Sequence, residues 1–190
     1  MLVKTYCAAV NGLDVTTVTI EVSLTKGVMF RMTGLGDTAV REGRDRMAAA
    51  LVNNGYLFPN ADITVNMAPA DLRKEGSGFD LPLAIGVLAA SKQIEPVGLD
   101  RIMLVGELGL DGALQPVKGA LPIAMRAKVD GFVALVVPQQ NVREAAVVEG
   151  IRVYGMSQMK EVISMITGQE RFQPVSVDTR KEFYDQQYST

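Results

Sequence analysis

A run without a single polar side chain, from Leu81 to Ala90, is the feature that most constrains the fold. Pro82 near its start is tolerated only in the first turn of a helix, because proline lacks the amide donor that later turns need. This places the helix start at about Asp80. A helix that is apolar all round has to be covered by other parts of the protein. The sequence therefore predicts a helix over about 80–91 that is buried on most sides.

The composition is typical of sheets covered by helices. Of 190 residues, 48% are apolar, only 6% are aromatic and none is Trp, so Val, Ala, Leu and Ile carry the burial. The length fits one domain of ordinary size, with or without a tail. No apolar run approaches the ~18 residues of a membrane-spanning helix, and the start of the chain lacks the basic-then-apolar order of a signal peptide. We expect a cytoplasmic protein that does not contact membrane.

Missing residue types exclude several chemistries. The chain has no histidine, which excludes Ser-His-Asp and Cys-His catalysis and histidine metal sites. Cys7 is the only cysteine, so no internal disulfide forms, and its apolar surroundings predict a small buried side chain. The net charge of −2 gives no general attraction for nucleic acid, so any such contact needs a local patch. A Ser-Lys or carboxylate site remains open, and we expect no metal site.

Strand patterns dominate the first half of the chain. β-Branched residues and apolar alternation predict strands over residues 2–10, 15–24, 28–33 and 63–67. Turn signals at Asn11-Gly12 and Lys26-Gly27 separate the first three strands, and the second and third are expected to form a hairpin. A helix follows, capped by Asp37 or Thr38 and ended by Gly55 in a left-handed conformation.

Strands alternate with helices in the second half. The predicted elements are a strand over 102–108, a helix over 119–129, a strand over 132–137, a short helix over 138–148, a strand over 151–154 and a helix over 159–166. This alternation is typical of parallel βαβ units. After Gly168 the composition becomes polar without a sustained period. We therefore predict a domain over 1–168 and a linker or extended tail over 169–190.

Two glycine-rich loops lead into the helices. Gly34–Ala39 matches the dinucleotide-binding pattern G-x-G-x-x-A, but its strand is expected to close a hairpin and no acidic residue follows at the required spacing, so a simple glycine turn is favoured. The second loop offers backbone amides and a helix start to an anion, or is a tight connection with Asp80 as the helix-start acid. Its candidate interaction residues are Arg73, Lys74, Glu75, Gly76, Ser77, Gly78 and Asp80.

Three further interpretations stay open at the level of single residues. Ser77 with Lys118 could form a Ser-Lys dyad if the fold brings them together. Arg41, Arg44 and Arg46 form either a solvated, salt-bridged helix face or a patch that contacts DNA or a partner. The phosphate-binding pattern G-x-x-x-x-G-K-[ST] is absent, so the chain is not expected to hydrolyse ATP.

Three segments carry a family resemblance. Residues 34–42 read GLGDTAVRE, residues 66–82 read NMAPADLRKEGSGFDLP and residues 105–112 read VGELGLDG. The first two resemble the signatures G-L-P-D-x-A-V-x-E and N-L-A-P-A-D-L-x-K-E-G-S-x-F-D-L-P of the ComM/YifB (magnesium-chelatase-like) AAA+ ATPases, with Gly36 in place of proline. The third resembles the G-E-x-x-L-x-G strand and turn of Lon proteases and the RadA carboxy-terminal domain. The likeness runs over about residues 1–168.

The resemblance implies an α+β fold: the Lon-protease-like variant of ribosomal protein S5 domain 2, with a mixed sheet flanked by helices. It also bears on the dyad. Aligned with Lon's K-D-G-P-S-A-G and P-I-G-G-L-K motifs, the catalytic serine position falls on Gly78 and the lysine position on Leu121. A displacement of even ~1 Å usually costs catalysis, so Ser77, one residue early, is not expected to be a nucleophile, and we predict no peptidase activity.

The resemblance implies an accessory amino-terminal domain of a ComM-type ATPase, which acts in DNA processing and branch migration during transformation. The ATPase module, absent from this chain, would bind ATP and Mg²⁺. The implied partners are that module and neighbouring subunits of a ring, with DNA as a further candidate. Two alternatives remain: a Lon-type peptidase that uses Ser77, and a domain that only mediates oligomerisation or protein contacts.

Overall fold

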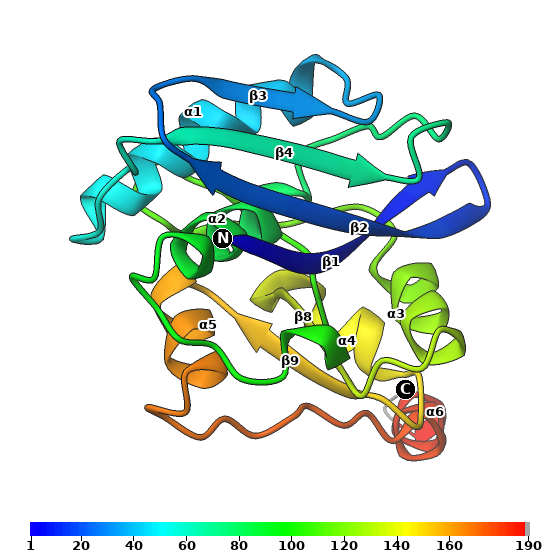
Figure 1. Cartoon of the computed structure of the whole chain (residues 1–190). Coiled ribbons are helices and arrows are strands. Elements are labelled where there is room, and N and C mark those ends of the chain that lie inside the picture. Colours follow the sequence, from blue (N-terminus) through cyan, green and yellow to red (C-terminus); the bar gives the residue numbers. More distant parts are fainter. Residues whose placement is uncertain (189–190) are drawn as a thin grey trace.

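The computed structural model describes residues 1–188 and shows two layers of sheet with helices around them (Figure 1). One layer is a four-stranded sheet in the order β1-β2-β4-β3, and α1 and α2 pack beside it. The bounds of these elements are β1 Leu2–Asn11, β2 Asp14–Thr25, β3 Phe30–Thr33, α1 Thr38–Asn53, β4 Asp62–Ala68 and α2 Asp80–Ala90. The mixed sheets and flanking helices agree with an α+β class.

The strand order corrects one prediction. The turn at Asn11-Gly12 does join an antiparallel pair, β1 and β2, but β2 and β3 form no hairpin, because β3 pairs in parallel with β4 on its far side. The chain between β2 and β3 is anchored to the start of β4. Asp62 accepts a hydrogen bond from the Met29 amide (2.8 Å), and the Met29 carbonyl accepts one from Ile63 (2.8 Å). This anchoring places β3 at the open edge of the sheet.

The second layer is a parallel sheet in the order β5-β8-β9. Its parallel pairing confirms the βαβ pattern expected from the sequence. The remaining elements are the 3₁₀ turn η1 Leu99–Arg101, β5 Ile102–Leu104, β6 Glu107–Leu108, β7 Leu114–Gln115, α3 Ala120–Val129, β8 Ala134–Pro138, the 3₁₀ turn η2 Gln139–Asn141, α4 Val142–Ala146, β9 Arg152–Met156, α5 Met159–Ile166 and α6 Thr179–Tyr188.

The strand expected over 102–108 is in fact two strands in two sheets. The break is at Gly106, which exchanges hydrogen bonds with the segment that leads into α2: its amide donates to the Gly78 carbonyl in the loop (2.9 Å), and its carbonyl accepts from Leu81 in the first turn of the helix (3.0 Å). These bonds take the chain out of the parallel sheet after β5. β6 then pairs with β7 in a short antiparallel hairpin, which confirms the tight turn predicted around Gly112.

The tail also differs from the predicted linker. Val175 pairs with Val153 at the edge of β9, its amide donating to the Val153 carbonyl at 2.8 Å. Residues 179–188 then form α6, tied to the domain by an ion pair between Arg143 and Glu182. The polar composition hid both features, since they depend on contacts with the domain and not on local periodicity. Residues 189–190 of the predicted tail lie outside the described residues.

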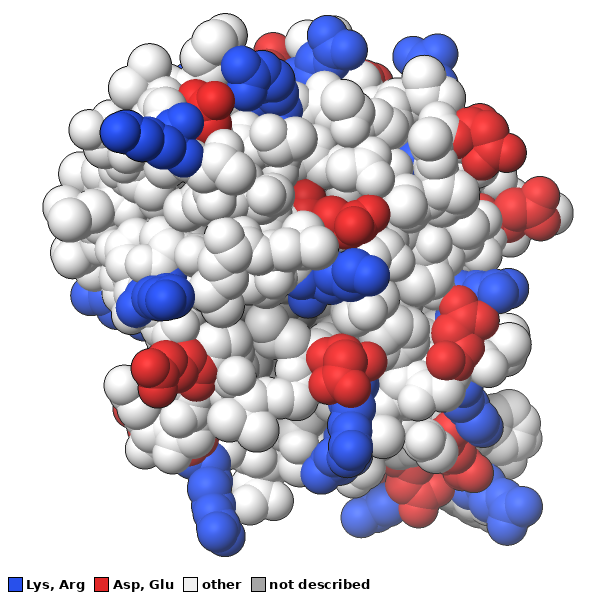
Figure 2. Space-filling view, viewed as in Figure 1, with Lys and Arg blue, Asp and Glu red and all other residues white. Residues whose placement is uncertain are grey.

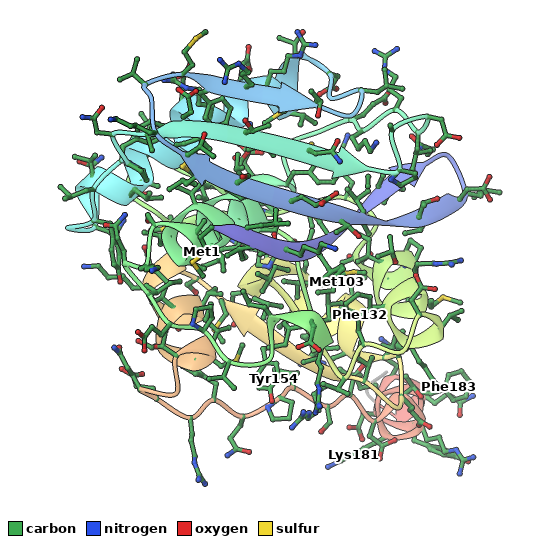
Figure 3. The ribbon with its side chains drawn as sticks, in the orientation of Figure 1. Met1, Met103, Phe132, Tyr154, Lys181 and Phe183 are labelled. Atoms are coloured by element: carbon green, nitrogen blue, oxygen red, sulfur yellow. The ribbon has the colours of Figure 1, made fainter. Side chains whose placement is uncertain are left out.

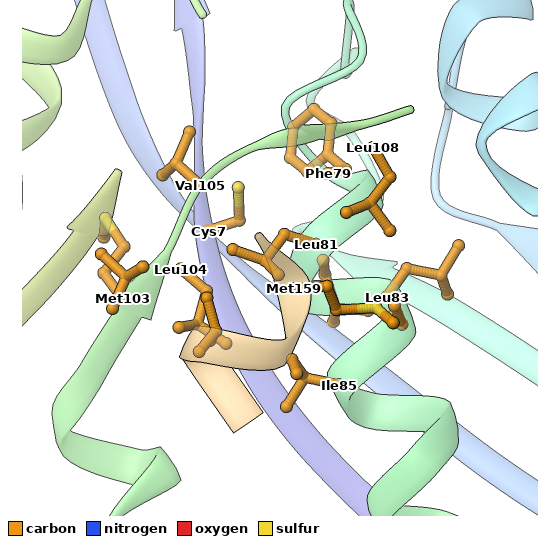
Figure 4. Packing of buried hydrophobic residues seen from close by; sticks show 14 of the residues in the cluster. Cys7, Phe79, Leu81, Leu83, Ile85, Met103, Leu104, Val105, Leu108 and Met159 are labelled. Carbon is orange, nitrogen blue, oxygen red and sulfur yellow. The ribbon is translucent and has the colours of Figure 1, made fainter. Parts of the chain in front are cut away.

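Helix α2 lies at the centre of the core. All of its residues are buried, as its apolar sequence predicted, and it packs between the two layers against β1, β2 and α1 (Figures 1 and 4). Gly86 lets it approach β2 closely, because a Cβ there would come within 2.8 Å of Val22. Thr5 of β1 donates a hydrogen bond to the Pro82 carbonyl (2.9 Å), which satisfies the buried Thr5 hydroxyl.

Shortening a buried side chain of α2 should therefore destabilise the whole domain. Ile85 is fully buried, and Ile85→Ala is expected to lower the free energy of unfolding by about 2–5 kcal/mol, through lost burial and the cavity left behind. Leu13→Ala is the matched control, since Leu13 is 100% exposed in the β1–β2 turn; it should change stability by less than about 0.5 kcal/mol. Urea unfolding measures both, and equal midpoints for the two variants would contradict this role of α2.

Candidate functional site

The two glycine-rich loops predicted from the sequence lie against each other. The Asp37 amide donates to the Lys74 carbonyl (3.0 Å), and the Lys74 amide donates to the Leu35 carbonyl (3.0 Å). Gly34 is required for the close approach of the first loop to β4: its φ is +105°, and a Cβ there would lie 2.2 Å from the Met67 carbonyl oxygen. The first loop therefore has a structural reason for its glycine, in keeping with the turn interpretation.

Asp37 connects the start of α1 to the second loop. One oxygen of its carboxylate accepts the Val40 amide (2.8 Å), which confirms the predicted helix cap. The other oxygen accepts the Gly76 amide at 3.4 Å. A single side chain thus fixes the loop relative to the helix.

The strongest polar interaction of the site joins Arg46 and Asp80. Arg46 Nε lies 2.6 Å from one oxygen of the Asp80 carboxylate, and Nη2 lies 3.0 Å from the other. Asp80 also accepts the Leu108 amide (3.0 Å), and Arg46 also donates to the Ala39 carbonyl (2.7 Å). A Cβ on Gly43 would lie 2.5 Å from the Asp80 carboxylate, so this helical glycine makes room for it. The pair ties α1, the start of α2 and β6 together.

Burial dominates the electrostatics of this pair. Asp80 is 1% exposed, and desolvation raises the pKa of its carboxyl, while the hydrogen bonds from Arg46 and Leu108 oppose that rise. The hydrogen bond to Asp80 raises the pKa of the Arg46 guanidinium, so the arginine stays charged. Arg46 was grouped with the exposed patch from its sequence position. The structure turns it inward instead, and it is a structural ion-pair partner.

Lys74 is also used internally. Its side chain is completely buried, and its ammonium group donates to the Pro69 carbonyl. Desolvation lowers the pKa of Lys74, and the nearby charge of Asp71 opposes this shift. Of the candidate interaction loop, the exposed members are Arg73 and Glu75, which pair with each other at 3.2 Å, and Gly76. The solvent-facing surface of the loop is therefore short and close to neutral.

The structure does not pair Ser77 with Lys118. Ser77 donates its hydroxyl to the carboxylate of Glu107, a partner that the sequence reasoning missed. Lys118 is exposed, and within residues 1–188 no hydrogen bond joins it to Ser77. A signal for Glu107 was present in the G-E-x-x-L-x-G segment, but its contact with Ser77 depends on the β5–β6 break.

The segments that carry the two aligned Lon positions do meet, but through apolar groups. A Cβ on Gly78 would lie 3.4 Å from Val105 and 3.5 Å from Val117. The Cys7 thiol donates to the Gly78 carbonyl at 3.5 Å. Burial raises the pKa of Cys7 to about 12, so this thiol remains protonated and is a packing group. At the other position, the Leu121 amide donates to Glu144 (3.2 Å).

The arginine patch on α1 is reduced to one unpaired side chain. Arg44 lies over the rings of Phe30 (5.4 Å) and Phe58 (5.5 Å) and pairs with Asp45 at 3.1 Å. Arg41 is exposed and forms no ion pair among the described residues. Across the face shown in Figure 2, acidic and basic side chains are interspersed and no large field of one sign is seen.

The described residues contain neither a metal cluster nor a membrane-spanning helix. Among residues 1–188, no three Cys, Asp or Glu side chains are grouped closely enough to hold a metal ion. Over the same residues, no helix combines the length and hydrophobicity needed to cross a bilayer.

Comparisons with known proteins give the family of this chain. The family model described as subunit ChlI of Mg-chelatase matches residues 20–141. Competence protein ComM of Haemophilus influenzae is 39% identical over 178 residues, which is 93% of this chain and 35% of ComM. YifB of Escherichia coli is 39% identical over 181 residues, covering 93% of this chain and 36% of YifB. An uncharacterized protein of Mycobacterium tuberculosis is 41% identical over 166 residues, which is 87% of this chain and 33% of that protein.

The matching family model covers more than half of the chain, which therefore belongs to the magnesium-chelatase-like AAA+ family that includes ComM and YifB. The chain spans about a third of the length of these relatives. A more distant match is Lon protease 2 of Bacillus subtilis, 25% identical over 125 residues, covering 64% of this chain and 22% of the protease.

Removing Arg46 should lower the free energy of unfolding, because Asp80 then loses its ion-pair partner. Arg46→Ala leaves the Asp80 carboxylate buried without its cation, which should cost about 3–5 kcal/mol. The matched control is Arg126→Ala, because Arg126 pairs with Asp130 at 2.8 Å but is 42% exposed; it should cost less than about 1 kcal/mol. Chemical unfolding at neutral pH measures both variants.

The same variant has an expected pH dependence. Without Arg46, the folded-state pKa of Asp80 rises further above its unfolded value, so the folded state binds a proton more tightly. The stability deficit of Arg46→Ala relative to the unchanged protein should therefore narrow as the pH falls from about 7 to about 5. A deficit that widened over that range would show that Asp80 is not the group left unpaired.

Proposed function

We propose that the chain is a non-catalytic accessory domain of a ComM-type ATPase, with the ATPase module in another part of a longer protein. The observation that carries this proposal is the coverage: the chain matches ComM and YifB over almost its whole length yet spans about a third of theirs. It contains no G-x-x-x-x-G-K-[ST] pattern. ATP and Mg²⁺ would accordingly bind in the other module, and the partners would be that module and neighbouring subunits of a ring.

The loops of this chain do not fit a nucleotide. A phosphate-binding loop presents free backbone amides and a lysine to the phosphates. Here the Gly76 amide faces Asp37, and Lys74 is buried against Pro69. We therefore assign no nucleotide step to this domain.

The fold is proposed to be the Lon-like variant of ribosomal protein S5 domain 2. The mixed four-stranded sheet, the buried helix α2 behind a glycine loop and the β6–β7 hairpin with the G-E-x-x-L-x-G segment support this assignment. The distant match to Lon protease 2 also supports it.

The proposed role is mechanical and not chemical. The Arg46–Asp80 pair and the Asp37 cap hold the loop over 73–78 in one conformation, and rigid loops are suited to positioning a neighbouring module. Arg73, Glu75 and Gly76 are the loop residues that face solvent and would meet the ATPase module or an adjacent subunit. By analogy with the competence protein ComM, the longer protein would process DNA and drive branch migration during transformation.

The match to Lon protease 2 favours a second candidate, a Lon-type peptidase that uses Ser77. Activation of a serine by lysine needs the two side chains within hydrogen-bond reach. Ser77 donates to Glu107, and Lys118 is exposed, so this arrangement supplies no base of the Lon type. A third candidate is a domain that serves only for oligomerisation or protein contacts.

A peptidase assay separates the first two candidates. With a fluorogenic peptide library, the chain should show no turnover above the buffer blank, and Ser77→Ala should behave identically. Ser91→Ala is the matched control, because the Ser91 hydroxyl bonds only locally at the end of α2. It lies 2.8 Å and 3.2 Å from the carbonyls of Val87 and Leu88 and accepts the Gln93 side-chain amide at 3.0 Å. Turnover that is lost in Ser77→Ala and kept in Ser91→Ala would establish the peptidase and overturn the accessory-domain proposal.

A further inference from the structure

The three strands of the parallel sheet share an unusual feature where each begins. Before every strand the chain makes a tight turn through a glycine with positive φ, and each turn carries an exposed cation. The pairs are Gly98 with Arg101 before β5, Gly131 with Lys128 before β8, and Gly150 with Arg152 at the start of β9. Parallel neighbours begin at the same edge of their sheet. The topology therefore gathers three cations at one edge.

Two surface hollows lie side by side at this edge. The first is lined by Lys128, Gly131, Phe132, Val133, Gly150, Ile151 and Arg152. The second is lined by Val97, Gly98, Arg101, Ile102, Val133, Ala134, Arg152, Tyr154 and Met165. They share Val133 and Arg152, so the two hollows adjoin, and most of their lining residues are apolar. We call these two hollows, with their cations Arg101, Lys128 and Arg152, the basic trough.

The cations of the basic trough are not neutralised. No carboxylate lies within salt-bridge distance of any of the three among the described residues, whereas Arg126, also on α3, is paired with Asp130. No acidic residue lines either hollow. Asp100 and Glu149 are nearby in the chain but are not part of the lining. In a protein of net charge −2, this is a local positive site of the kind that the sequence analysis required for polyanion binding.

The spacing of the cations fits a chain of phosphates. The Val133 amide donates to the Arg101 carbonyl (3.0 Å), and the Arg152 amide donates to the Val133 carbonyl (3.1 Å). Arg152 lies in register with Ala134 and Ile102, so the two arginines are two strands apart and one residue out of register. Two strand spacings separate their backbones by about 10 Å. Lys128 lies across Gly150, where a Cβ would come within 3.1 Å of its Cε. One small anion would be held by groups that converge on it, whereas these cations come from the starts of three separate elements.

Aromatic rings stand among the cations. Tyr154 lines one hollow and Phe132 the other. Both are partly buried against the core, and the Phe132 ring packs on Tyr6 with centroids 5.4 Å apart. Figure 3 shows both residues on the lower half of the molecule, on the side of β9. Single-stranded nucleic acid is typically held by a positively charged groove with aromatic side chains on which bases stack. A duplex or an acidic peptide would make no comparable use of the rings.

We infer that the basic trough binds the backbone of single-stranded nucleic acid through Arg101, Lys128 and Arg152. This site is separate from the Arg41 and Arg44 patch on α1. The inference rests on the proposed DNA-processing function and specifies the contact through which this domain would take part in it.

Fluorescence anisotropy with labelled dT30, at several salt concentrations from about 50 to 200 mM, tests this inference on the whole chain. Three phosphate contacts predict that log K falls with log salt with a slope of about −2. The triple variant Arg101→Ala/Lys128→Ala/Arg152→Ala should lose at least tenfold in affinity at the lowest salt. The matched control is Lys4→Ala/Lys26→Ala/Lys160→Ala, which removes three exposed lysines and gives the same net charge; it should bind like the unchanged chain. Thermal melting checks that both variants are folded.

Other outcomes overturn the inference in distinguishable ways. If Arg41→Ala/Arg44→Ala abolishes binding and the trough variant does not, the domain contacts DNA on α1 and the trough assignment fails alone. If the chain binds no dT30 at all, both the trough assignment and the DNA contact of the proposed function fail. That result would favour a domain that serves only for oligomerisation or protein contacts. If poly-glutamate displaces dT30 as well as unlabelled dT30 does, the trough is a surface for acidic proteins.

Discussion

Asp80 places a carboxylate at the first turn of a helix whose other residues are apolar and buried. The cost of removing this charge from water has to be compensated by other groups. Arg46 supplies the charge, the Leu108 amide supplies a third hydrogen bond, and Gly43 leaves the space. One interaction thereby fixes the angle of α1 to α2 and the position of the β6–β7 hairpin. The loop between β4 and α2 inherits its conformation from this arrangement, because both of its ends are held.

The same arrangement explains why the loop between β4 and α2 is better suited to positioning a neighbouring module than to catalysis. Each polar group that could serve a catalytic site has an internal partner: Lys74 with Pro69, Ser77 with Glu107, Asp37 with two backbone amides. Where the two aligned Lon positions approach each other, Val105 and Val117 face Gly78. A site satisfied in this way is rigid, which suits a module that orients a larger machine. The three unpaired cations of the basic trough lie elsewhere, at the start of the parallel sheet.

The sequence predicted most of the elements, since periodicity, caps and glycine turns are local signals. It placed the start of α2 at Asp80 correctly, and of the two caps that it offered for α1, Asp37 and Thr38, the structure uses Asp37. It failed where long-range contacts decide: β3 pairs with β4 because Asp62 anchors the chain, and 102–108 splits because Gly106 bonds to the α2 loop. Arg46 looked exposed by position, although Gly43 one turn away on α1 was a sign of something packed there. The basic trough could not be foreseen, because its cations are far apart in the chain.

The claim that this chain is the accessory part of an ATPase is tested most directly by the natural gene. The reading frame that contains Thr190 should be determined beyond that codon and translated. The account predicts that it continues into a segment with G-x-x-x-x-G-K-[ST], the phosphate-binding loop of an ATPase module. A stop codon directly after Thr190 would contradict the account, and the domain would then act on its own through the peptidase or partner-binding routes.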